Sequence, residues 1–168
     1  QLLKFGRVRL KISPNPFAAG APFEQCLRLR QGEITISAGA AERSVAIRIW
    51  IDANHPVIRV EANSSSPFEL QATVELWRRE SRQLTGGELH GVYGLQGAPF
   101  PIYTHADTLA GDGTNRLVWY HRNATSIWTN NLEHQGMADF ITKSNDPLLH
   151  RTFGACIEGS GLIRTCPT

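Results

Sequence analysis

The sequence has 168 residues, and its 17 lysines and arginines against 15 aspartates and glutamates give a formal net charge of +2. This length fits one domain that can bury a core without disulfide bonds. The charges are interspersed instead of forming a basic run, so nucleic acid is not an expected partner. No apolar run approaches the roughly 20 residues that a membrane helix requires, so no membrane partner is expected either.

Apolar and polar residues alternate with a period of two in the first half of the chain, which predicts strands with one wet face. The expected strands span residues 8–12, 26–30, 34–36, 45–51, 57–62 and 68–77. A tight hairpin is expected at Gly32, because glycine tolerates positive φ. In the 45–51 strand, Ile47 and Ile49 should share one face, with Arg48 and Trp50 on the other.

Residues 80–115 contain many glycines and few alternating apolar residues, which predicts a long Gly-rich connection. Loops of this length are often functional or mobile. The strand pattern resumes at residues 117–121 and 148–157. No long segment has apolar residues at the i, i+3, i+4, i+7 spacing of a helix, so little helix is expected. We therefore predict an all-β fold, a large antiparallel β-sandwich formed by residues 1–168 as one domain. The start at Gln1, without an initiator methionine, suggests that this sandwich is truncated at its N-terminus.

The richest cluster of recognition chemistry lies between residues 117 and 128. Indole, imidazole, guanidinium and amide groups can hold a sugar or a planar ligand by stacking and forked hydrogen bonds. The candidate ligand-binding residues are Trp119, His121, Arg122, Asn123 and Trp128. In a strand, Trp119 and His121 point to one face and Arg122 points to the other, so one of the two faces should belong to the core. The alternative is that the aromatic side chains only pack the interior.

No catalytic residue is predicted. Glycoside hydrolysis needs two carboxyl groups that face each other across the scissile bond. Spacing singles out no pair among Glu24, Asp52, Asp107, Asp112, Glu133, Asp139 and Asp146. No metal ligand set and no cofactor is predicted, because the histidines and cysteines lack the spacing of a metal cage. Cys26 and Cys156 lie in strand-like apolar contexts and are expected to be core thiols, whereas Cys166 is left unassigned.

Several separated runs resemble one family across nearly the whole chain. They are Leu2–Leu10, Pro14–Phe17, Pro22–Phe23, Trp50–Ile58, Glu75–Arg78, Trp119–Asn123 and Asp146–Gly154. These runs resemble the N-terminal β-sandwich domain of bacterial glycoside hydrolase-like proteins of unknown function. Those proteins are similar in layout to glycoside hydrolase family 95, in which a β-sandwich precedes a catalytic (α/α)6 barrel.

The resemblance implies a secreted or periplasmic protein that takes part in polysaccharide degradation. It implies a non-catalytic sandwich that packs on a C-terminal (α/α)6 domain of the same parent chain and contributes to carbohydrate binding. Two alternatives stay open. One is a free-standing carbohydrate-binding module with exposed tryptophans, and the other is a structural sandwich without a ligand.

Overall fold

The structure is a computed structural model, and it describes residues 5–111 and 113–165; Asp112 and Cys166 therefore lie outside the described residues. Among the described residues, strands account for 39% and helices for 13%. The strands pair in antiparallel sheets, so the predicted all-β, sandwich-like fold is confirmed. The chain divides into two compact units. We call Val8–Val74 the sheet unit, and Gln1–Arg7 with Glu75–Thr168 the loop unit.

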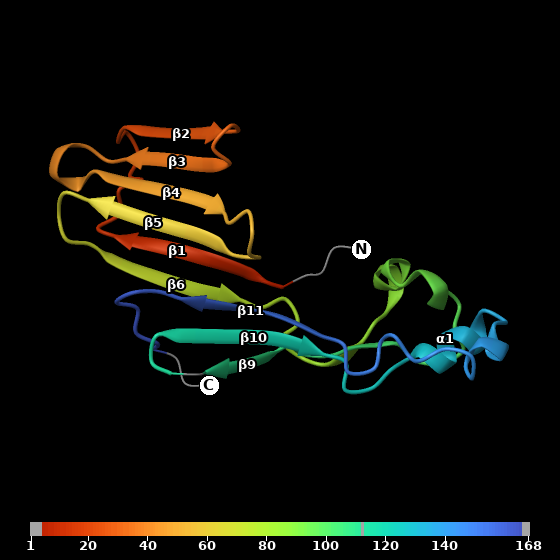
Figure 1. Cartoon of the computed structure of the whole chain (residues 1–168). Coiled ribbons are helices and arrows are strands. Elements are labelled where there is room, and N and C mark those ends of the chain that lie inside the picture. The colour runs from red at the N-terminus through yellow and green to blue at the C-terminus, as the bar shows by residue number, and fades with distance from the viewer. Residues whose placement is uncertain (1–4, 112, 166–168) are drawn as a thin grey trace. The chain divides into compact units, whose positions relative to one another are not determined.

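The main feature of the sheet unit is a four-stranded sheet in which consecutive strands are neighbours (Figure 1). Its strands are β2 (Phe23–Arg28), β3 (Glu33–Ala38), β4 (Val45–Ile51) and β5 (Ile58–Ser64). Gly32 closes the β2–β3 hairpin with a φ of 65°, so the predicted turn is confirmed. A 3₁₀ turn, Ala41–Arg43, joins β3 to β4. β1 (Arg7–Ser13) and β6 (Glu69–Glu75) form a separate two-stranded sheet.

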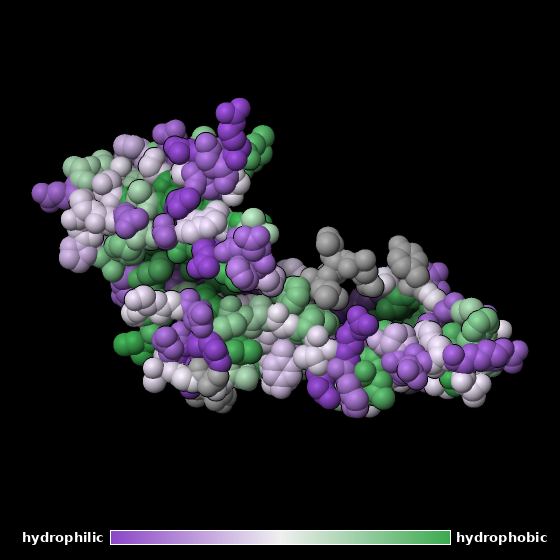
Figure 2. All heavy atoms as spheres, viewed as in Figure 1, coloured by the Kyte–Doolittle hydropathy of each residue, from purple (hydrophilic) through white to green (hydrophobic). Residues whose placement is uncertain are grey.

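The strand register separates an apolar face from a polar face, as the alternation predicted. Ile47 lies between Ile36 on β3 and Ala62 on β5. Arg48, on the opposite face, lies between Thr35 and Glu61. In this unit the buried apolar side chains are Ile12, Ala38 and Val45. Larger apolar side chains remain exposed at the margins of the sheet, and Figure 2 shows hydrophobic residues reaching the surface.

A three-stranded sheet organises the loop unit, with β10 in its centre between β9 and β11. The elements of this unit are β7 (Arg82–Gln83), β8 (Tyr103–Thr104), β9 (Thr108–Gly111), β10 (Arg116–Arg122), α1 (Trp128–His134) and β11 (Thr152–Glu158). Its 3₁₀ turns are Gly86–Gly91, Tyr93–Leu95 and Ala138–Phe140. The buried apolar side chains are Leu95, Ile102, Trp119 and Leu132.

The region 80–115, predicted as a long Gly-rich connection, includes several short elements. It contains the short strands β7, β8 and β9 as well as two 3₁₀ turns. At the start of the first turn, Thr85 and Glu88 form a reciprocal capping box, and Arg82 holds the Glu88 carboxylate. Local side-chain bonds thus build short elements that a hydrophobic period cannot reveal.

Both described cysteines are exposed, so the prediction that they are core thiols was wrong. Cys26 alternates in phase with Glu24 and Arg28, which places it on the polar face of β2. Cys156 alternates in phase with Thr152 and Glu158 on β11, where those positions are exposed. In each strand the phase of the alternation, and not the apolar character of the neighbours, decides where the thiol points.

Candidate functional site

Trp119 is the most buried of the five candidate residues. It lies in the middle of β10, and only 5% of its surface is accessible. Its indole Nε1 donates a hydrogen bond to the backbone oxygen of Phe5. A Cβ added at Gly6 would lie 2.8 Å from the backbone oxygen of Glu75, so the chain at Gly6 passes close against its neighbours. With its donor used and its ring enclosed, Trp119 packs the interior of the loop unit.

His121, two residues along the same face of β10, belongs to a polar cluster. Its Nδ1 lies 3.0 Å from Oδ1 of Asp107, and Arg78 Nε donates to the same oxygen at 2.7 Å. A carboxylate only accepts hydrogen bonds, so the imidazole carries its hydrogen on Nδ1. The Phe153 ring centroid lies 5.3 Å from that of His121 and 5.4 Å from Cζ of Arg78. The cluster therefore joins three distant segments of the chain around one carboxylate.

Arg122 and Asn123 follow at the end of β10 and have different surroundings. Arg122 is exposed, as expected for the face opposite Trp119 and His121. Asn123 connects the two chain segments at this end of the sheet: its Nδ2 donates to the backbone oxygen of Leu148 at 2.9 Å, and its backbone N–H donates to Arg151 at 3.0 Å. The amide of Asn123 is thus engaged in holding the loop before β11.

Trp128 is the candidate residue that borders a cavity. It is the first residue of α1, and its backbone N–H donates to Oγ of Ser126 at 3.1 Å. Ser126 also hydrogen-bonds to Asp146, whose Oδ1 accepts the backbone N–H of Leu148 at 2.7 Å. Burial opposes ionisation of Asp146, but these hydrogen bonds outweigh it and lower its pKa. Asp146 thereby fixes the start of the helix that carries Trp128.

The cavity beside Trp128, which we call the α1 pocket, has a volume of about 390 Å³. Its lining residues are Trp128, Asn131, Leu132, Gln135, Met137, Phe140 and Ser144. More than half of the Phe140 surface is exposed. The indole Nε1 of Trp128 is buried and has no hydrogen-bond partner among the described residues. A buried donor without a partner is unfavourable by about 1–3 kcal/mol, so a rearrangement that supplies an acceptor would stabilise this wall.

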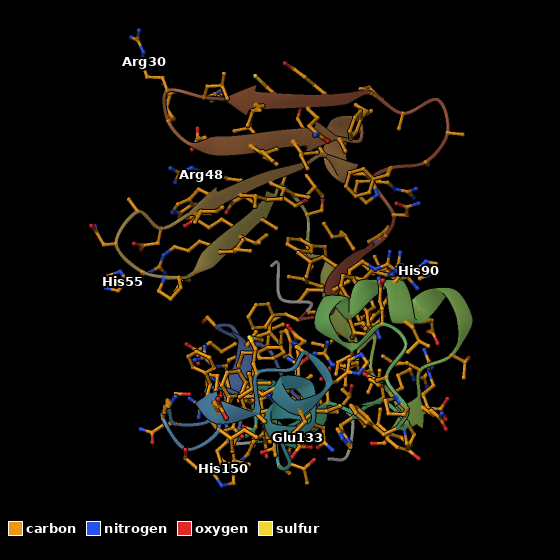
Figure 3. All side chains as sticks on the ribbon, turned by 90° about the vertical axis from the view of Figure 1, so that its right-hand side faces the viewer. Arg30, Arg48, His55, His90, Glu133 and His150 are labelled. Atoms are coloured by element: carbon orange, nitrogen blue, oxygen red, sulfur yellow. The ribbon has the colours of Figure 1, made fainter. Side chains whose placement is uncertain are left out.

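An amide pair forms the helical wall of the α1 pocket. Gln135 Nε2 donates to Oδ1 of Asn131 at 2.6 Å. The 3₁₀ turn at Gly94 packs closely on this pair, since a Cβ there would lie 2.4 Å from Gln135 Nε2. His134 Nε2 lies 3.0 Å from the backbone oxygen of Gln96 and ties the same segment to the helix. Glu133, which lies between Asn131 and Gln135 in the sequence, is labelled in Figure 3 and marks this part of α1.

The structure does not gather the five predicted residues into one cavity. Only Trp128 borders the α1 pocket, and its partners there were not predicted. A signal for them existed, because Trp128, Asn131, Leu132 and Gln135 have the i, i+3, i+4, i+7 spacing of one helix face. Two of these positions are amides, which hides the face from a search for apolar residues.

Among the described residues, no group of three or more histidine, cysteine or acidic side chains comes together in a way that could hold a metal ion. In the same part of the chain, no helix has both the length and the apolarity needed to cross a membrane.

A family model described as "Domain of unknown function (DUF5703)" matches residues 1–167, almost the entire chain. The chain belongs to the DUF5703 family. No curated protein and no solved structure matches it significantly. The comparisons thus connect the chain with a family of unknown function, and they do not link it to glycoside hydrolase family 95.

Proposed function

We propose that this DUF5703 domain binds carbohydrate in the α1 pocket. The observation that carries the proposal is the combination of an exposed ring, Phe140, with the side chains of Asn131, Gln135 and Ser144 around one cavity. Apolar faces of sugars stack on aromatic rings, and amides and hydroxyls can both donate to and accept from sugar hydroxyls. The volume is within the usual range for small-ligand sites, which favours a short saccharide or the end of a chain.

The wider setting is part of the same proposal. The resemblance to glycoside hydrolase-like proteins supports a non-catalytic domain that works beside an (α/α)6 domain of a secreted or periplasmic parent protein. The α1 pocket is lined by aromatic rings, amides, a hydroxyl and the apolar side chains of Leu132 and Met137, and groups of these kinds serve binding. Cleavage of a glycosidic bond would require carboxyl groups contributed by the partner domain.

A titration with neutral oligosaccharides, followed by NMR of the labelled chain, tests the proposal. Phe140→Ala should weaken binding by about fivefold or more, because a lost aromatic contact of about 1 kcal/mol or more has that effect. Phe17→Ala is the matched control, since Phe17 is also an exposed ring but lies in the sheet unit. Equal affinity of the Phe140→Ala and native chains would contradict a role for the α1 pocket.

A second candidate is a free-standing carbohydrate-binding module that uses Trp77. Among the four tryptophans, Trp77 is the one with more than half of its surface exposed. An open indole face is the usual stacking platform for a sugar. If Trp77→Ala abolishes binding and Phe140→Ala does not, this second candidate replaces the α1 pocket. If no oligosaccharide binds at all, the result favours the alternative of a structural sandwich without a ligand.

A further inference from the structure

Another cavity lies at one end of the four-stranded sheet, in the sheet unit. It has a volume of about 630 Å³. Four of its lining residues, one from each strand, form a row: Glu24 pairs with Ser37, Ser37 with Ala46, and Ala46 with Asn63. The lining also includes Ser44 and Ser65. We call the four paired residues the end row.

Side-chain size accounts for the depression. The two central strands contribute Ser37 and Ala46, which are short, while the outer strands contribute the longer Glu24 and Asn63. Three steps between adjacent strands of about 4.8 Å each separate the two outer strands by about 14 Å. The next row on this face carries the much longer Arg48, whose position on β4 is labelled in Figure 3. The end row is therefore a low floor between two polar ends.

The polar groups of the end row differ from the rest of the polar face in their hydrogen bonding. Farther along the strands, Glu33 is held by Arg28 and Arg48, and Arg48 also lies 4.3 Å above the ring of Trp50. Those side chains have used much of their bonding capacity on one another.

In the end row, by contrast, the side chains still have free hydrogen-bond donors and acceptors. Glu24, Ser37 and Asn63 have no side-chain hydrogen bond or ion pair with any described residue. Together they offer carboxylate oxygens, a hydroxyl and both a donor and an acceptor from the amide.

We propose that the end row is a second binding site, for a neutral oligosaccharide that lies across the strands. An extended ligand is favoured because the polar groups lie at both ends of a long floor. A hydroxyl-bearing ligand is favoured because carboxylate, hydroxyl and amide groups together complement sugar hydroxyls. Glu24 is the charged residue of the lining and its charge is negative, so it disfavours uronate sugars by repulsion. This site is independent of the α1 pocket.

The test uses the full chain, labelled with ¹⁵N, and four probes: cellohexaose, mannohexaose, xylohexaose and, as an anionic comparison, hexagalacturonate. At least one neutral probe should shift the amide signals of Ser37, Ala46 and Asn63, and hexagalacturonate should not. Ala46→Tyr places a ring on the floor and should weaken binding by about tenfold or more, which is roughly 1.4 kcal/mol. Gln71→Tyr is the control, because Gln71 is an exposed strand residue outside the cavity.

Asn63→Ala provides a second variant if Ala46→Tyr does not fold. It should reduce the shifts that the neutral probe causes in the amide signals of Ser37 and Ala46. The inference is overturned if no neutral probe shifts the end-row amides, or if a folded Ala46→Tyr or Asn63→Ala chain binds as the native chain does. Shifts at Asn131 and Gln135 without shifts at the end row would support the α1 pocket and refute the second site. The opposite pattern would support the second site and refute the α1 pocket.

Discussion

Each unit of this protein buries one carboxylate between two basic side chains, but the two clusters differ in their access to water. In the loop unit, the Asp107 side chain is 2% exposed, and its partners Arg78 and His121 are 19% and 12% exposed. In such surroundings the attraction between charges is strong, and so is the penalty for leaving one of them unpaired. The whole Asp107 cluster is withdrawn from solvent.

In the sheet unit, the Glu33 side chain is 7% exposed, but Arg28 and Arg48 are 52% and 50% exposed. Water and salt screen these cations even though the acid beneath them is buried. The hydrogen bond from Arg48 to Glu33 raises the pKa of the guanidinium, yet Arg48 can be solvated if that bond is lost. The comparison shows that the burial of the basic partners, more than that of the acid, should decide how much each cluster stabilises its unit.

The largest expected effect is therefore at Asp107. Asp107→Asn keeps the shape of the side chain but removes the charge that pairs with Arg78. Because this removes the buried charge that pairs with two largely buried basic side chains, the free energy of unfolding should fall by about 3 kcal/mol or more. Urea unfolding followed by tryptophan fluorescence measures the change.

Asp139→Asn is the matched control for that measurement, because Asp139 is exposed on a 3₁₀ turn of the same unit. It should change the free energy of unfolding by less than about 0.5 kcal/mol. If Asp107→Asn were as mild as this control, the cluster would be solvated, and the contrast between the two units would be wrong.

The strands could be predicted from the sequence because period-two alternation is a local property of the chain. Ile47 and Arg48 were assigned to opposite faces correctly for this reason. The Asp107 cluster could not be predicted, since Arg78, Asp107 and His121 lie in three separate segments that only the fold brings together. Spacing along the chain carries no information about such contacts.

The α1 pocket escaped prediction for a different reason. The helix has only seven residues, shorter than the window over which a helical period can be recognised. Phe140, the exposed ring of the α1 pocket, belongs to the 3₁₀ turn that follows the helix, and a turn this short has no hydrophobic period. Aromatic content indicated one wall of this cavity through Trp128, whereas the partners of Trp128 depend on the path of the backbone after α1.

A smaller effect is expected at Glu33. Glu33→Gln removes the carboxylate but leaves Arg28 and Arg48 about half exposed, so water replaces most of the lost interaction. The free energy of unfolding should fall by about 1 kcal/mol or less, and the difference should shrink in 1 M salt, where the screening length is about 3 Å. Glu69→Gln on the exposed side of β6 is the control. A loss as large as that of Asp107→Asn would show that exposure of the cations does not control the strength of the cluster.

The smallest effect concerns Glu88, which lies on the surface of the loop unit and extends the comparison to a pair in which the acid is exposed as well as the cation. Hydrogen bonds from Arg82 lower the pKa of Glu88 from 4.5 to about 2. Because the folded pKa lies below the usual value, the pair's stabilisation is complete above pH 4.5 and is lost as the pH falls toward 2.

An NMR titration of the Glu88 carboxyl carbon should give a midpoint near 2 in the native chain, and Arg82→Gln should move it back toward 4.5. Arg79→Gln removes another exposed cation of the same unit as a control and should leave the midpoint in place. A native midpoint close to 4.5 would mean that solvent separates Arg82 from Glu88, and the capping box at Thr85 would then have to hold the turn by itself.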